Sequence, residues 1–415
     1  MAEQTKNFEQ ATGTHSTVTR RSALKGLGLA GASFMLPDFL RSAAFGSSNL
    51  LEEAAKLKSA TQNPKWYGFN LLEYFSTDPD WMKYFPYKND GMFLEDDFRW
   101  ISDWGFNWVR LPMDYRFWTE SQDLLKIREK DVLPIDRAIK LGEKYGVHVN
   151  LCLHRAPGYC ILDTMNEALT GIHITKEKGD LFTDQKMLDA FVYQWTYFTN
   201  RYKGISSKQL SFNLVNEPLI FSGTGEIGRD ASSYAKVART AVAAIKQQDA
   251  QRLVITDGFV AGNAVIPELF DTGMMQSCHT YTPMPVTHYQ CEWARGILTG
   301  KEPLPTWPLK TSDGKTVNRQ FLENLFAPWG EAGAHVPIHF GEMGCYKHTP
   351  PDVVLAWFED TLGTIGNLHY GWALWNFRGP FGVLDTERKG TKYEDWHGHA
   401  LDRALLILLQ KKMTA

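Results

Sequence analysis

The sequence predicts an α/β fold, a (β/α)8 TIM barrel in a single domain, on the basis of three observations. Short apolar strands alternate with amphipathic helices over residues 62–411, a pattern typical of a parallel sheet. The alternation gives eight strand–helix units, the number that closes into a barrel. Polar or aromatic side chains follow nearly every strand. A doubly wound open sheet is the alternative, but no glycine-rich phosphate-binding turn follows the first strand.

The first four strands are short apolar runs that end in polar residues. They span residues 66–71, 107–112, 147–154 and 210–217. Between them, apolar residues recur at helical spacing in three segments. These segments are residues 98–104, 135–145 and 187–202. Gly146 and Gly204 follow the second and third segments closely, where a glycine commonly ends a helix.

The second half of the chain repeats this pattern. Strands are predicted at residues 253–257, 277–281, 336–340 and 370–376, and helices at 232–247, 320–332, 353–362 and 395–411. Residues 282–316 are rich in Pro, Gly and Trp, so we expect a long loop there. Such loops in compact domains are usually functional or disordered.

Residues 1–44 are predicted to be a signal peptide. Arg20 and Arg21 precede a short, weakly apolar run over residues 26–36, an arrangement that resembles a twin-arginine export signal. The run is too short to span a bilayer. The alternative is a basic N-terminal helix on a cytosolic protein. The predicted domain organisation is a signal peptide at 1–44, an N-terminal lead at 45–61 and one catalytic domain at 62–411.

Composition excludes several classes of function. The formal net charge is −3 and the isoelectric point is about 6.5, which gives no electrostatic case for nucleic acid or an anionic membrane. No run is long enough for a membrane span in the mature chain. Aromatic residues make up 13% of the chain, enough for a large core and for side chains that stack on sugar rings. We expect a monomer.

The five cysteines do not match a zinc site or a disulfide-dense scaffold. They are Cys152, Cys160, Cys278, Cys291 and Cys345. One or two bridges are possible in an oxidising compartment, with Cys152–Cys160 and Cys278–Cys291 as the local candidates. No strand end carries a cluster of metal-ligand type, so we expect neither a metal nor a cofactor.

Two glutamates end buried strands. Glu342 follows the apolar run 336–340 within the stretch IHFGEMGCY, and Glu217 ends the run LSFNLVNE, 125 residues earlier. In a parallel barrel the carboxyl ends of the strands converge on one cleft. Two facing carboxylates there suggest acid–base or nucleophilic chemistry with paired carboxyl groups.

Other strand ends carry further polar and aromatic groups. In chain order the whole set is Asn70, Arg110, His154, Asn216, Glu217, Asp257, His279, Tyr281, Glu342 and Trp375. Each alone has an ordinary structural explanation, such as a core histidine or an ion pair between strands. Their occurrence at one end of every strand favours a single active site.

Seven motifs in this order carry a family resemblance. They are GFN at 68–70, VRLP at 109–112, LH at 153–154, VNEP at 215–218, HTY at 279–281, GE at 341–342 and ALWNF at 373–377. The set resembles glycoside hydrolase family 5, the cellulase-like retaining β-glycosidases of clan A. The resemblance implies a hydrolase that cuts a β-glucan-type polysaccharide or its oligosaccharides by double displacement, like an endo-β-1,4-glucanase. The twin-arginine-type signal at residues 1–44 predicts that this hydrolase is exported and is periplasmic or extracellular.

The resemblance also implies roles for the two carboxylates. Glu217 is similar to the family's general acid/base and Glu342 to its nucleophile. Retaining enzymes hold the pair about 5–5.5 Å apart. Arg110 is expected to lower the pKa of the nucleophile, and Tyr281 to donate a hydrogen bond to it.

The remaining site residues are implied to bind substrate. Asn216 would hold the sugar 2-hydroxyl, and His154 and His279 would bind hydroxyls and orient the glutamates. Trp375 would form the platform under the sugar. An exo-acting β-glucosidase, a β-mannanase and a transglycosylase remain alternatives on the same fold. A catalytically silent glycan-binding barrel is the alternative from another class.

Several residues near the strand ends depart from the family pattern and are candidates for shaping the cleft. Glu73 and residues 155–159 could mould substrate binding, and residues 378–382 could narrow one end of the cleft. Trp293 and Trp307 are either sugar platforms or loop anchors.

Overall fold

The computed structural model describes residues 63–83, 92–164, 176–220, 231–294 and 298–414. The predicted signal peptide at 1–44 and the lead at 45–61 lie outside these residues. Within them, no helix is long and apolar enough to cross a membrane.

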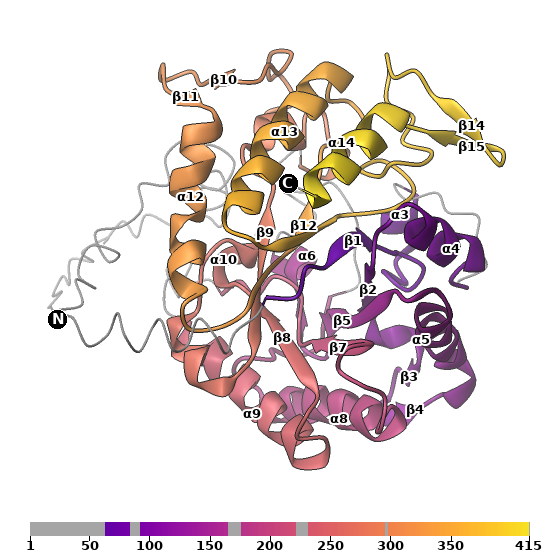
Figure 1. Cartoon of the computed structure of the whole chain (residues 1–415). Helices are drawn as coiled ribbons and strands as arrows, with labels where there is room; N and C mark the ends of the chain where they lie inside the picture. Colours follow the sequence, from indigo (N-terminus) through magenta and orange to yellow (C-terminus); the bar gives the residue numbers. More distant parts are fainter. Residues whose placement is uncertain (1–62, 84–91, 165–175, 221–230, 295–297, 415) are drawn as a thin grey trace, which may run out of the picture.

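Eight parallel strands close into a ring, which confirms the predicted barrel (Figure 1). They are β1 (Tyr67–Asn70), β2 (Trp108–Asp114), β5 (His148–Ala156), β7 (Leu210–Asn213), β8 (Leu253–Asp257), β9 (Met275–Thr280), β12 (Ile338–Met343) and β13 (Gly371–Leu374). The hydrogen-bonded order is β2-β1-β13-β12-β9-β8-β7-β5, and the pairing of β5 with β2 closes the ring. Each barrel strand therefore ends next to two others.

The main helices lie outside this ring (Figure 1). They are α4 (Glu95–Asp103), α5 (Leu133–Tyr145), α8 (Gln185–Arg201), α9 (Ser232–Gln248), α12 (Arg319–Ala332), α13 (Pro351–Asn367) and α14 (Arg403–Met413). Helix α5 illustrates why they form: Ile135, Ala138 and Ile139 are buried on one face, and Gly146 ends the helix with a φ of 66°. Burying each large aliphatic side chain of this kind stabilises the fold by about 1.5–3 kcal/mol.

Short helices and strands lie in the connections between the barrel strands and the main helices. They are α3 (Pro79–Met82), η2 (Tyr115–Phe117), β3 (Thr119–Glu120), β4 (Asp123–Ile127), η3 (Glu129–Asp131), β6 (Tyr159–Cys160), α6 (Ile161–Thr164), α10 (Phe259–Gly262), η4 (Pro267–Thr272), α11 (Met284–Thr287), η5 (Glu292–Ala294), β10 (Leu309–Lys310), β11 (Thr316–Val317), β14 (Glu394–Trp396) and β15 (His399–Leu401). The predicted long loop at 282–316 thus contains α11, η5 and β10, and β10 pairs with β11. Strand β6 returns antiparallel along β5.

The prediction of one C-terminal helix over residues 395–411 is wrong in its first part. Strands β14 and β15 form an antiparallel hairpin there, and α14 begins only at Arg403. His397 and Gly398 connect the two strands with positive φ values of 53° and 85°. Two such residues suit a two-residue hairpin turn and cannot continue a right-handed helix.

The core has two layers of apolar side chains. The larger lies between the ring and the helices. The smaller consists of residues that follow the strands, at the carboxyl end of the barrel, and includes Phe75, Trp81, Trp293, Trp375 and Phe381. This second layer builds an apolar wall beside the strand ends where the site residues were predicted.

The predicted disulfide candidates do not form. All five cysteines are free and buried. Cys152 instead lies inside the barrel, where its sulfur is 3.0 Å from a guanidinium nitrogen of Arg110. Sequence proximity therefore did not place Cys152 against Cys160, or Cys278 against Cys291.

Candidate active site

The predicted site residues lie at the carboxyl ends of the barrel strands. Arg110 is on β2, His154 on β5, Asn216 and Glu217 follow β7, His279 is on β9 with Tyr281 just after it, Glu342 is on β12, and Trp375 follows β13. Hydrogen bonds and ion pairs join six of them into one cluster: Arg110, Asn216, Glu217, His279, Tyr281 and Glu342. The rings of His154 and Trp375 contact each other.

Glu217 and Glu342 face each other at the centre of this group. One carboxylate oxygen from each, together with a ring nitrogen of His279, all lie within 4.8 Å of one another. The side chain of Glu217 is 15% exposed and that of Glu342 only 4%. Glu217 is thus the more open carboxyl group, and Glu342 lies deeper in the barrel.

The tight backbone around Glu342 depends on a glycine. A Cβ atom at position 341 would lie 2.4 Å from the hydroxyl of Ser277 on the neighbouring strand. The register between β12 and β9 also shifts between Phe340 and Glu342, which pairs Glu342 with His279. Strand β12 spans Ile338–Met343 and so continues past the predicted end at residue 340.

Arg110 donates hydrogen bonds to several residues of the site at once. Its guanidinium donates hydrogen bonds to one oxygen of Glu342, to Asn70 Oδ1 at 3.1 Å, to Asn216 Oδ1 at 2.8 Å and to Asp257 Oδ2 at 3.1 Å. Arg110 is 1% exposed. A guanidinium held by this many acceptors has a fixed orientation and presents a fixed charge to Glu342.

The protonation of Glu342 is set by opposing effects. Burial raises its pKa to about 7, and the charge of Glu217 adds to that shift, whereas His279 and Arg110 lower the pKa. The expected effect of Arg110 is therefore present, but burial outweighs it. Tyr281 donates a hydrogen bond of 3.0 Å to the second oxygen, which favours the ionised form.

His279 lies between the carboxyl groups. Its Nδ1 is 2.9 Å from Glu217 Oε1 and 3.6 Å from Glu342 Oε1, and its Nε2 is 3.3 Å from Asp257 Oδ2. Although burial lowers its pKa, the charges of Asp257 and Glu342 outweigh burial and raise it to about 10. The imidazole is therefore protonated at neutral pH, and both ring N–H groups face carboxylates.

Two of the predicted substrate-binding residues, His154 and Asn216, each have a buried polar atom without a hydrogen-bond partner among the described residues. These atoms are Nδ1 of His154 and Nδ2 of Asn216. Burial holds the pKa of His154 well below its usual value, so its ring is neutral. The ring lies 5.6 Å from that of Trp375 and 4.5 Å from that of Phe75. Burying a donor or acceptor without a hydrogen-bond partner costs stability. A hydroxyl group of a bound sugar would supply a partner for each of the two atoms.

Some residues of the site were not predicted. Asn213 accepts from Arg110 Nε at 2.8 Å and donates to Asp257 at 3.0 Å, and Cys152 also contacts the guanidinium. A polar residue within the apolar strand LSFN was a weak signal for Asn213. No local pattern identified Cys152, because its partner Arg110 comes from a different strand.

The cleft-edge candidates have different environments. Trp307 donates from its indole to Asp360 at 2.8 Å, as a loop anchor would. Trp293 is 8% exposed and packs against Trp81 and Phe381. The side chain of Arg378 is largely buried and forms an ion pair with Asp97, which fixes its position.

A cation at the site would face competition from the protein's own charges. Among the described residues, the side chains Glu217, His279 and Glu342 form the one group close enough to share an ion. Arg110 already pairs with Glu342, and protonated His279 donates rather than ligates. These three side chains are thus arranged as an acid–base cluster.

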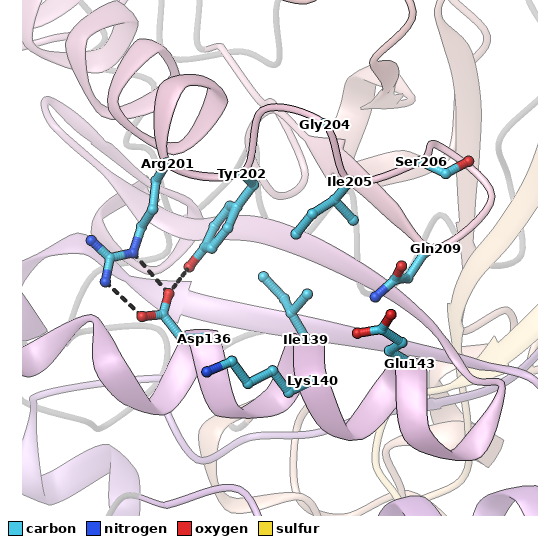
Figure 2. Close-up of a pocket in the computed structure, with 10 residues that line it drawn as sticks. All are labelled: Asp136, Ile139, Lys140, Glu143, Arg201, Tyr202, Gly204, Ile205, Ser206 and Gln209. Carbon is cyan, nitrogen blue, oxygen red and sulfur yellow. Dashed lines mark hydrogen bonds and ion pairs between the residues drawn. The ribbon is translucent and has the colours of Figure 1, made fainter.

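A separate depression of about 660 Å³ lies away from this cluster (Figure 2). It is lined by residues of α5, of the end of α8 and of the turn before β7, at the amino end of the barrel, and none of the site residues lines it. Asp136 pairs there with Arg201 at 2.6 Å and accepts from Tyr202 at 2.9 Å. The carboxylate cluster, and not this depression, carries groups arranged for catalysis.

Comparisons with known proteins point to one family. A family model described as cellulase (glycosyl hydrolase family 5) matches residues 58–379. Endoglucanase C of Acetivibrio thermocellus is 22% identical over 334 residues, which cover 74% of this chain and 90% of that protein. Cellodextrinase A of Ruminococcus flavefaciens is 23% identical over 288 residues, which cover 67% of this chain and 77% of that protein.

A solved structure gives the same result. The crystal structure of a glycoside hydrolase is 36% identical, with a TM-score of 0.74, and the match covers 84% of this chain and 99% of that one. With a family model that spans most of the barrel, the chain belongs to glycosyl hydrolase family 5 and is an O-glycosyl hydrolase.

Proposed function

We propose that the protein is a retaining β-glycoside hydrolase that cuts β-1,4-linked glucan chains internally. The spacing of the two glutamates carries the proposal: their nearest oxygens lie within 4.8 Å. Retaining glycosidases hold the two carboxyl groups about 5–5.5 Å apart, whereas inverting enzymes leave about 6.5–9.5 Å for a water molecule. The relatives named endoglucanase and cellodextrinase support a β-glucan substrate.

The first step forms a glycosyl-enzyme. An ionised oxygen of Glu342 attacks the anomeric carbon while the bond from that carbon to the leaving oxygen breaks. Glu217 donates its proton to the leaving oxygen. In the second step Glu217 removes a proton from water, and the resulting attack on the anomeric carbon releases Glu342. Two inversions leave the configuration of the sugar unchanged.

The surrounding residues stabilise the transition state. His279 and Arg110 keep positive charge beside the two carboxyl groups while Glu217 loses and regains its proton and Glu342 loses and regains its negative charge. Nδ2 of Asn216, unpaired among the described residues, suits a sugar 2-hydroxyl, and such contacts strengthen as positive charge develops on the ring. His154 and Trp375 would border the same sugar.

Two measurements test the proposal. Proton NMR of early products from an aryl β-cellobioside should show the β-anomer first. Early products from a soluble β-1,4-glucan should form a ladder of mixed oligosaccharides. Glu342→Ala should lose on the order of 10⁴-fold in kcat or more and keep the wild-type circular dichroism spectrum. An α-anomer formed first, or full activity of the variant, would refute the mechanism.

The same product profile tests the alternatives. Monosaccharide alone, from a polymer that is hardly shortened, would indicate an exo-acting β-glucosidase. Faster cutting of a soluble mannan would indicate a β-mannanase, and longer products at high acceptor sugar a transglycosylase. A silent glycan-binding barrel would bind oligosaccharides equally well with and without Glu342 and release no product.

We also propose export through the twin-arginine route, as a monomer. The support is the motif at Arg20 and Arg21. The free thiols of the fold add to it, because a chain that folds in a reducing cytoplasm before export needs no disulfide. Replacing both arginines with lysine should leave the enzyme in the cytoplasm of its host, as measured by activity in cell fractions. Light scattering of the purified protein tests the monomer.

A further inference from the structure

The backbone of Glu217 has an unusual conformation. Its φ is 48°, in the left-handed region that residues other than glycine avoid. Glu217 also precedes Pro218, and a proline ring pushes the preceding residue toward extended φ values. Such a conformation persists only where neighbouring groups hold it. Identifying those groups shows what positions the proposed acid/base.

The hydroxyl of Tyr159 bridges the turn that contains Glu217. It donates a hydrogen bond of 2.6 Å to the carbonyl oxygen of Glu217. It also accepts one of 2.9 Å from the N–H of Leu219. Pro218, between them, has no N–H. One side-chain oxygen therefore satisfies the backbone on both sides of the proline.

The backbone nitrogen of Glu217 is held by a second side chain. Its N–H donates to Asp257 Oδ2 at 3.1 Å, and Asp257 is also paired with Arg110 and His279. The backbone of Glu217 is thus fixed at its nitrogen by Asp257 and at its carbonyl oxygen by Tyr159. Asp257 belongs to that charged cluster, whereas Tyr159 holds the backbone of Glu217 from outside it.

The position of Tyr159 is itself rigid. It lies on β6, where it pairs with Ala156 of β5 across a turn at Pro157 and Gly158. It is 4% exposed, and its ring packs edge-on against Phe182 at 5.1 Å. Burial keeps the pKa of its hydroxyl well above the usual value, so the hydroxyl is protonated and can donate at neutral pH.

We propose that Tyr159 is the positioning residue for the acid/base: its hydroxyl holds the left-handed backbone of Glu217 and thereby aims that carboxyl group at the leaving oxygen. The inference rests on the proposed role of Glu217. It predicts that loss of the hydroxyl impairs proton donation selectively. Attack by Glu342 is spared, because the hydroxyl of Tyr159 bonds to the turn at Glu217 and not to β12.

The test uses two substrates with the same sugar and different leaving groups. Phenyl β-cellobioside needs a proton on its leaving oxygen, whereas 2,4-dinitrophenyl β-cellobioside does not. For Tyr159→Phe we expect kcat/KM to fall about 10- to 100-fold with the phenyl substrate. With the dinitrophenyl substrate it should fall less than about 3-fold. Equal losses with both substrates, or no loss with either, would overturn the proposal.

Tyr202→Phe is the matched control. It also removes a buried phenolic hydroxyl, which donates to Asp136 at 2.9 Å at the far end of the barrel. Its kinetics with both substrates should equal those of the wild type. If Tyr202→Phe showed the same selective loss, general loosening of the barrel would explain both variants and the proposal would fail.

Glu217→Ala separates this inference from the proposed function. It should show a larger loss with the same selectivity, and azide should restore turnover of the dinitrophenyl substrate with a β-glycosyl azide as product. Absence of selectivity in Glu217→Ala would refute the role of Glu217 itself. A selective Glu217→Ala beside a non-selective Tyr159→Phe would refute only the role of Tyr159.

A second variant covers the case in which Tyr159→Phe does not fold. 4-Aminophenylalanine at position 159 keeps a weaker donor and acceptor at the same place. Its kcat/KM should fall with the phenyl substrate and stay close to the wild-type value with the dinitrophenyl substrate. Uniform loss with both substrates would overturn the proposal in this variant too.

Discussion

At the scale of residues, the site is a cluster of buried charged groups in which positive and negative charges nearly cancel. Arg110 and His279 supply two positive charges, and Asp257, Glu217 and Glu342 supply three carboxyl groups. The charges of His279 and Arg110 overcome the effect of burial and hold the pKa of Asp257 well below its usual range. Because an uncompensated buried charge is costly, the positive charges of Arg110 and His279 are what allow carboxylates to be buried here.

The raised pKa of Glu342 leads to a prediction about the pH dependence of activity. Since burial raises the pKa of Glu342 to about 7, kcat/KM should fall as the pH drops through about 7 and the nucleophile is protonated. Tyr281→Phe removes a donor that stabilises the ionised form. The acid limb should therefore move up by about 1 pH unit. A pH profile of the two enzymes measures the apparent pKa of the pair, and a limb that moves down would contradict the assignment.

A second residue-scale prediction concerns Glu73. Its side chain is 6% exposed, and its Oε2 has no partner among the described residues. Burial and the charge of Asp97 raise its pKa to about 8, from an ordinary value of 4.5. The protonated side chain therefore contributes stability that is complete below about pH 4.5 and is lost as the pH rises through about 8.

Glu73→Gln removes this ionisation and keeps the shape of the side chain. It should be more stable than the wild type at pH 9, by a few kcal/mol at most, and differ little at pH 4.5. Urea unfolding at both pH values measures the effect. A variant that is equally destabilised at both would show that the carboxyl group makes a needed hydrogen bond.

At the scale of elements, the hairpin of β5 and β6 links two parts of the site. It carries His154 and Tyr159, and between them Arg155, which is 2% exposed. Arg155 pairs with Glu177 at 2.8 Å and with Asp163 at 3.3 Å. The segment 155–159, suggested by the sequence as a cleft edge, thus serves in the structure as a buried support for the strand ends.

Gly158 is the residue on which this hairpin depends. Its φ is 77°, and a Cβ atom would lie 2.6 Å from the backbone nitrogen of Leu181 and 2.8 Å from Met187. Gly158→Ala should therefore cost about 1–3 kcal/mol of stability and lower kcat by displacing Tyr159. Chemical unfolding and steady-state kinetics check both effects.

Gly146→Ala is the control for this change. Gly146 also has a positive φ, of 66°, but nothing lies within 4 Å of its added Cβ. We expect a loss of about 1 kcal/mol from the end of α5 and unchanged kcat. If Gly158→Ala were as active as Gly146→Ala, the hairpin would not be what positions the site.

At the scale of the whole molecule, closure of the ring produces the site. Pairing of β1 with β13 joins the first and last strands of the barrel, and pairing of β2 with β5 completes the sheet. Arg110 can therefore reach Glu342, 232 residues away. The apolar layer at the carboxyl end surrounds this cluster and lowers the local dielectric, which strengthens each charge interaction.

The buried cysteines give a prediction at the same scale. All five are free, and burial raises the pKa of each thiol. The native protein should therefore react with almost no thiol reagent. In denaturant without a reducing agent it should react at all five cysteines. A smaller number would show a disulfide, and dithiothreitol should leave the melting temperature unchanged.

The sequence by itself determined the architecture and the chemical type of the site. Alternating strand and helix patterns are local, because the periods of side-chain burial are properties of neighbouring residues. Glu217 and Glu342 were identifiable because each follows an apolar run in the sequence. In the structure Glu217 lies just after β7 and Glu342 near the end of β12. The hairpin at 394–401 was missed because its turn depends on positive φ values, which His397 does not signal.

Only the tertiary structure decided which distant groups meet. Three features depend on segments far apart in the chain. Oxygens of Glu217 and Glu342 lie within 4.8 Å of each other, Tyr159 donates a hydrogen bond to the backbone of Glu217, and the cysteines are free. The pKa of Glu342 likewise comes from burial and from charges on other strands. Local patterns specify the elements, whereas contact distances and electrostatics arise only when the ring closes.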